Sequence, residues 1–130
     1  MKKIYFIFCG VLLLGAGCGL PVNKVPQDTT TATATAETLP EGAVAIYYAT
    51  GCSHCEVVLG YIKQIRADQK LNIILKESYN DQDNYNELMQ RVKICGIPLY
   101  QVGVPLLWDG KTCYRGDANI KAYLDARMKK

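Results

Sequence analysis

Cys52 and Cys55 stand two residues apart, and the only histidine of the 130-residue chain, His54, lies between them. A Cys-x-x-Cys pair can ligate a metal, close a structural disulfide or exchange electrons with other thiols. A structural zinc site needs four nitrogen or sulfur ligands, commonly from two close pairs. Cys95 and Cys113 are the alternative source of two further ligands, but they form no second close pair. We therefore expect neither a metal nor an organic cofactor here.

The pair falls between a predicted strand and a predicted helix. Residues 43–50 form an apolar, β-branched and aromatic run, and residues 56–69 show apolar positions at helical spacing. Backbone N–H groups at a helix start favour an anion, whereas a staple so short removes little entropy from the unfolded chain. We interpret Cys52 as the nucleophile, Cys55 as the resolving cysteine and a protonated His54 as a further stabiliser of the thiolate. A purely structural disulfide is the alternative.

The elements that would position this pair alternate strand and helix along the rest of the domain. Asp81 or Asp83 can serve as the N-cap of the second helix, and Asp117 as the N-cap of the last one. The expected elements are a strand over 71–78, a helix over 83–95, two short strands around an Asp109-Gly110 turn, and a helix over 117–130.

The order β-α-β-α-β-β-α, with Cys-x-x-Cys at the first strand-to-helix junction, resembles the thioredoxin superfamily and most closely its small glutaredoxin-like branch. The resemblance covers nearly all of residues 42–130 and rests also on the motif Gly103-Val104-Pro105. It implies an α/β thioredoxin-like fold with a central four-stranded mixed sheet flanked by helices. It also implies a cis peptide bond before Pro105, and contact of Val104 and Pro105 with the substrate. Some glutaredoxin relatives share a [2Fe–2S] cluster between two copies, which is a further alternative.

Two departures bear on the direction of electron flow. Thioredoxin and the periplasmic thiol oxidases keep a buried acid six residues before the first cysteine, and Ile46 stands there in this chain. This departure argues against a proton relay through a buried carboxylate and matches glutaredoxin-like members better. A histidine directly before the second cysteine resembles those oxidases. We therefore expect an oxidising or exchange role towards protein thiols. The alternatives are a glutaredoxin-type reductase and a redox-inactive thioredoxin-like binding module.

Cys95 and Cys113 bring the domain to four cysteines, and an even number is expected where disulfides persist. A bond between them would close a longer loop and stabilise the fold by about 3 kcal/mol. We predict a structural disulfide. The alternative is a second redox pair that relays electrons to or from the first.

The N-terminus indicates export. Lys2 and Lys3 precede an apolar run that ends in small residues and Cys18. This resembles a bacterial lipoprotein signal, which implies a signal peptide over 1–17 and lipid on Cys18. Residues 18–41 are rich in Thr, Ala and Pro and predict a flexible tether to the folded domain at 42–130.

The predicted location is therefore the cell envelope, extracytoplasmic and lipid-anchored. In a cell that has an outer membrane, that membrane is favoured because Gly19 follows the cysteine. The charges, 15 Lys and Arg against 12 Asp and Glu, form no basic stripe that would indicate nucleic acid. We expect a monomer whose partners are exported client proteins, a redox partner that the sequence does not name, and the membrane.

Overall fold

The computed structural model describes residues 38–130, so the predicted signal peptide, Cys18 and most of the predicted tether lie outside the described residues. The described part contains four strands, three α-helices and two short 3₁₀ helices. In chain order they are β1 (Val44–Tyr48), α1 (Ser53–Gln64), η1 (Ala67–Gln69), β2 (Ile73–Glu77), α2 (Gln82–Ile94), η2 (Leu99–Gln101), β3 (Leu106–Trp108), β4 (Cys113–Arg115) and α3 (Gly116–Met128).

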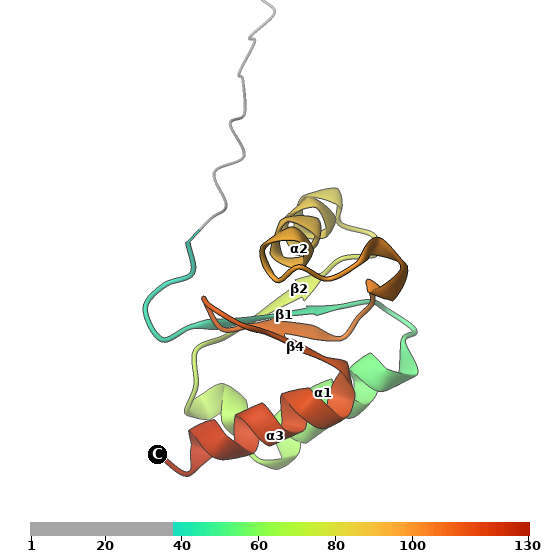
Figure 1. The fold of residues 1–130 in the computed structure, drawn as a ribbon. Helices are drawn as coiled ribbons and strands as arrows, with labels where there is room; N and C mark the ends of the chain where they lie inside the picture. Colours follow the sequence, from blue (N-terminus) through green and yellow to red (C-terminus); the bar gives the residue numbers. More distant parts are fainter. Residues whose placement is uncertain (1–37) are drawn as a thin grey trace, which may run out of the picture. The chain divides into compact units, whose positions relative to one another are not determined.

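The strands form one mixed sheet in the order β2-β1-β3-β4. β1 runs parallel to β2 and antiparallel to β3, and β3 pairs antiparallel with β4. Figure 1 shows α2 on one face of the sheet and α1 with α3 on the other. The predicted fold class is confirmed: this is a thioredoxin-like α/β fold with a four-stranded mixed sheet between helices.

The core consists of two apolar layers, one on each face of the sheet. Alternate residues of a strand point to opposite faces, so neighbouring residues of β1 enter different layers. Ile46 packs with Val58 and Ile62 of α1, whereas Tyr47 packs with Leu88 of α2. Since all of these side chains are buried, β1 is fixed from both sides and its end is a rigid base for the segment that follows.

Two local predictions need correction. The first helix ends at Gln64 rather than continuing to residue 69, because Arg66 adopts a left-handed backbone with φ of 54° and the chain restarts as η1. The prediction that Asp117 is an N-cap was wrong: α3 begins at Gly116, its N-cap residue is Arg115, and no side chain caps it. For α2, the side chain of Asp81 accepts the backbone N–H of Asn84 at 2.9 Å and is the cap.

No helix within residues 38–130 has the length and apolar character needed to cross a membrane.

Candidate active site

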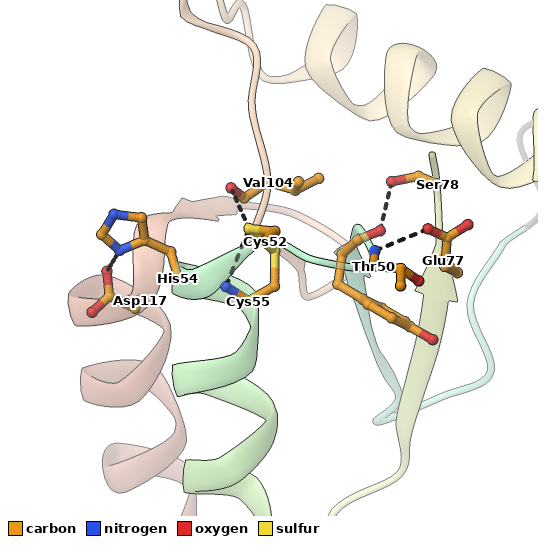
Figure 2. The surroundings of a disulfide bond; sticks show 9 residues. Thr50, Cys52, His54, Cys55, Glu77, Ser78, Val104 and Asp117 are labelled. Carbon is orange, nitrogen blue, oxygen red and sulfur yellow. Dashed lines mark hydrogen bonds and ion pairs between the residues drawn. A yellow bond between two sulfur atoms is a disulfide. The ribbon is translucent and has the colours of Figure 1, made fainter. Parts of the chain in front are cut away.

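Cys52 is the N-cap residue of α1, with an extended backbone (φ −87°, ψ 109°). Its Sγ accepts the backbone N–H of Cys55 at 3.3 Å, and its carbonyl accepts the N–H of Glu56 at 3.0 Å. Gly51 before it has φ of 78°, a left-handed conformation that allows the sharp turn out of β1. Cys52 and Cys55 form a disulfide with their Cα atoms 5.2 Å apart (Figure 2). A sulfur anion on Cys52 would therefore lie at the positive end of a twelve-residue helix.

The two cysteines differ in exposure. Cys55 is only 1% exposed, whereas Cys52 is half-buried. A thiol approaching from outside therefore reaches the sulfur of Cys52 first. The sulfur of Cys55 can act only from within, on a bond that Cys52 has made.

The loop before β3 covers the disulfide from the other side. The peptide bond between Val104 and Pro105 is cis, and the Val104 carbonyl oxygen lies 3.8 Å from the Sγ of Cys52. The Pro105 carbonyl accepts the backbone N–H of Gly116 at 3.0 Å. This bond ties the proline loop to the first residue of α3, so the starts of β3 and α3 both hold the surroundings of Cys52 in place.

His54 pairs with an acidic residue of α3. Its Nδ1 lies 3.1 Å from Oδ1 of Asp117, and the side chains are 72% and 34% exposed. In Figure 2 the imidazole extends towards Asp117 and away from the disulfide. A positive charge on His54 would thus be partly offset by the carboxylate. The sequence interpretation missed Asp117 as a site residue; its position in the first turn of the last helix was the available signal.

Glu77 at the end of β2 holds the segment that leads to Cys52. Its Oε1 accepts the backbone N–H of Thr50 at 3.1 Å (Figure 2). Its Oε2 accepts the N–H of Asn80 at 2.8 Å. Ser78 donates its backbone N–H to the Tyr48 carbonyl at 2.8 Å. The N–H of Asn80, with a further contribution from Thr50, keeps the pKa of Glu77 below its ordinary value. No signal in the sequence singled out Glu77.

A charged cluster lies beneath α2, on the far face of the sheet from α1. Glu87 accepts hydrogen bonds from the Tyr47 hydroxyl at 2.8 Å and from Arg91 Nη2 at 3.0 Å, and it pairs with Lys76. Burial alone would raise the pKa of Glu87, but these three donors outweigh it and the pKa lies below the ordinary value. Burial raises the pKa of Tyr47 strongly. The contacts of the cluster join β1 and β2 to α2.

Cys95 and Cys113 form the second disulfide, with their Cα atoms 6.1 Å apart. Cys95 is the C-cap residue of α2, and Cys113 is the first residue of β4. Both pack against the core layer under α2. The structure therefore places this pair on the opposite face of the sheet from α1, which carries Cys55.

Within residues 38–130, no group of three or more His, Cys, Asp or Glu side chains could hold a metal ion. The Cys52–Cys55 pair, the helix start and the adjacent proline loop instead form an arrangement suited to thiol–disulfide exchange.

Comparisons with known proteins add a distant structural likeness. No family model and no curated protein matches the chain. Among solved structures, the chain is similar to glutaredoxin 1 from Francisella tularensis, determined in complex with cacodylate, with a TM-score of 0.45 and 18% sequence identity. The match covers 68% of this chain and 98% of that one. With so distant a likeness, the chemistry of the site has to follow from its own residues.

Proposed function

We propose that the protein is a thiol–disulfide oxidoreductase that exchanges disulfides with protein thiols, through Cys52 as the attacked and attacking cysteine and Cys55 as the resolving one. One observation carries the proposal. Cys52 is half-buried and its sulfur accepts an N–H group of the first helical turn, while Cys55 is 1% exposed. A disulfide that only stapled the chain would gain nothing from this asymmetry.

The exchange proceeds in two displacements. A client thiolate attacks the Sγ of Cys52, which breaks the Cys52–Cys55 bond; the Cys55 sulfur leaves with the electron pair and takes up a proton. A second client thiolate then attacks the client sulfur of this mixed disulfide and expels Cys52 as a thiolate. The client loses two electrons and gains a disulfide, and the cysteine pair is reduced to two thiols.

The helix start favours this direction. The Cys52 thiolate is the leaving group of the second displacement, and the N–H of Cys55 together with the dipole of α1 stabilises it. A cysteine pair whose reduced form is stabilised is the stronger oxidant. Ile46 stands where thioredoxin and the periplasmic thiol oxidases both carry an acid, so this position does not separate the two roles. On the stabilised Cys52 thiolate we favour the oxidising role over the reductase role.

We further propose that the protein acts outside the cytoplasm, anchored through lipid on Cys18. This rests on the signal-like sequence of residues 1–18 and on the tether-like composition that follows. Two disulfides in so small a domain are also typical of exported proteins.

The reduction potential of Cys52–Cys55 is the decisive measurement. The purified protein is equilibrated in thiol buffers of graded potential, alkylated, and read cysteine by cysteine by mass spectrometry. A pair far more oxidising than thioredoxin, whose potential is about −270 mV, supports the donation of disulfides. A value near that of thioredoxin would overturn the oxidising role and favour a reductase.

Trapping of clients tests whether there is exchange at all. In a Cys55→Ser variant the free Cys52 thiolate attacks a disulfide of a client protein and expels one client sulfur. The resulting mixed disulfide cannot be resolved from within, so we expect reductant-sensitive adducts with exported proteins. A Cys52→Ser variant should form none through this pair, because Cys55 is buried. If the Cys52→Ser variant supports client oxidation as well as the parent does, the protein is a binding module instead.

A further inference from the structure

The second disulfide, Cys95–Cys113, borders an open groove instead of lying inside the core. Both cysteines are half-buried. The groove has a volume of about 380 Å³, which is enough for a small molecule. Its lining includes both cysteines together with Ile97, Lys111, Arg115 and Asn119.

The charges at this groove are of one sign. Lys111 and Arg115 are exposed cations, and no acidic residue lines the groove. Arg115 Nη1 donates to the neutral side-chain oxygen of Gln101 at 3.0 Å, so this contact leaves its charge uncompensated. The nearest turn carries Asp109, which accepts the backbone N–H groups of Lys111 and Thr112 at 2.9 and 2.7 Å. The groove therefore attracts anions to the disulfide.

The two sulfurs are not equivalent as leaving groups. Cys95 follows the last turn of α2, where the negative end of the helix dipole disfavours a thiolate. Cys113 lies two residues from Arg115 on the same face of β4, about 7 Å away along the strand, where a cation favours a thiolate. The Arg91 carbonyl oxygen lies 3.7 Å from the Sγ of Cys113 and can accept the hydrogen of that thiol after reduction. Attack on Cys95 with departure of Cys113 is thus the favoured course.

We propose that Cys95–Cys113 is a second exchange site, whose substrate is a small thiol that carries a carboxylate. The thiolate attacks the Sγ of Cys95 and forms a mixed disulfide, and the Cys113 sulfur leaves with the electron pair and takes up a proton. A second thiolate then attacks the small-molecule sulfur of this mixed disulfide and expels Cys95 as a thiolate, which takes up a proton. Two thiols become one small-molecule disulfide, and the protein pair gains two electrons and two protons.

This site works independently of the first pair. Cys113 pairs with Trp108, which pairs with Ala45 near the start of β1, whereas Cys52 follows the end of β1. The second pair also packs on the face of the sheet opposite to α1. The second pair therefore exchanges with its own thiol, without direct transfer to the first pair.

The test uses the full chain with Cys52→Ser and Cys55→Ser, so that only the second disulfide can respond. The protein is exposed to 3-mercaptopropionate or to 2-mercaptoethanol, and reduction of Cys95 is followed over time by alkylation and mass spectrometry. Each rate constant is corrected for the fraction of the reagent present as thiolate. The quantity compared is the rate constant of 3-mercaptopropionate, which carries a carboxylate, divided by that of 2-mercaptoethanol, which carries none. We expect the anionic thiol to react faster.

Charge reversal at the groove gives the specific readout. In the Lys111→Glu/Arg115→Glu variant the ratio should fall about fivefold to tenfold, as expected for two charge reversals about 7 Å away in water with moderate salt. The matched control is Lys63→Glu/Lys70→Glu, two exposed lysines remote from the groove that change the net charge equally. The control should keep the ratio of the parent. Circular dichroism verifies that both variants are folded.

Three results would overturn the assignment. A disulfide that resists every small thiol until the chain unfolds is a staple only. A ratio that the control lowers as much as the groove variant reflects net charge and not a site. If an acidic cysteine-containing peptide reacts faster than 3-mercaptopropionate, the substrate of the groove is a protein segment and not a small thiol. Because the first pair is absent from the test, its activity or inactivity does not affect the result.

Discussion

Glu87 is the residue whose loss should reveal how much the charged cluster under α2 stabilises the fold. Its carboxylate accepts hydrogen bonds from the Tyr47 hydroxyl and Arg91 Nη2 and forms an ion pair with Lys76. The Glu87 side chain is 12% exposed. Glu87→Gln keeps the shape but removes the charge that compensates two cations. Breaking a well-buried ion pair costs about 3–5 kcal/mol, and partial exposure lowers this, so we expect a loss of about 2–3 kcal/mol.

The single tryptophan provides the assay. Trp108 is buried in the same layer, with the Arg91 guanidinium 5.5 Å from its ring centre, so its fluorescence follows unfolding of this region in urea. At about 4–8 °C per kcal/mol for a domain of this size, the thermal midpoint should fall by roughly 10–20 °C. The control is Glu56→Gln on the exposed face of α1, which should change stability by less than about 0.5 kcal/mol. A loss below about 1 kcal/mol at Glu87 would refute the reasoning.

The pH dependence follows from the same contacts. The pKa of Glu87 in the folded protein lies below its ordinary value of 4.5, so the unfolded chain takes up a proton at higher pH than the folded one. The stabilisation is therefore present above about pH 4.5 and is lost as the pH falls through the folded pKa. The difference in stability between the parent and Glu87→Gln should be constant from pH 7 to 5 and shrink towards pH 3. A difference that stays constant to pH 3 would contradict this.

Two further predictions concern backbone and cross-link. Gly51→Ala places a side chain in open space but at φ of 78°, so the free energy of unfolding should fall by about 1–2 kcal/mol. Gly60→Ala, also in open space but within α1, should raise the free energy of unfolding by about 0.5–1 kcal/mol. Removing the second disulfide by Cys95→Ala/Cys113→Ala opens a loop of sequence separation 18 and should cost about 3 kcal/mol in urea unfolding. Equal effects of the two glycine changes, or no loss without the disulfide, would contradict these expectations.

The fold was predictable because its signals are local. A continuous apolar, β-branched and aromatic run over 43–50 and helical spacing after Cys55 were enough to predict β1 and α1, and the resemblance of the element order to the thioredoxin superfamily implied the sheet. The end of α1 was not predictable, because the left-handed turn at Arg66 has no glycine to mark it. An N-cap at Asp117 was a sound local expectation, but its carboxylate is engaged by a histidine 63 residues away.

The candidate site divides in the same way. The cysteine pairs and the Val104-Pro105 motif can be read from residue type and spacing, and the structure supplies their bonds and exposures; their roles in exchange stay predictions. Glu77 escaped notice because it contacts Thr50 across 27 residues of sequence. Such contacts depend on the register between β1 and β2, which no pattern within either strand determines.

The shortness of β4 has a consequence for a protein proposed to exchange disulfides with other proteins. An unpaired sheet edge is a template on which another chain can add a strand and begin to aggregate. β4 is an edge strand of only three residues, fastened to α2 through Cys113 at its start and continued directly by α3 at Gly116. So little free backbone cannot hold a foreign strand. Client proteins can therefore reach the half-buried Cys52, while this edge of the sheet offers them little free backbone.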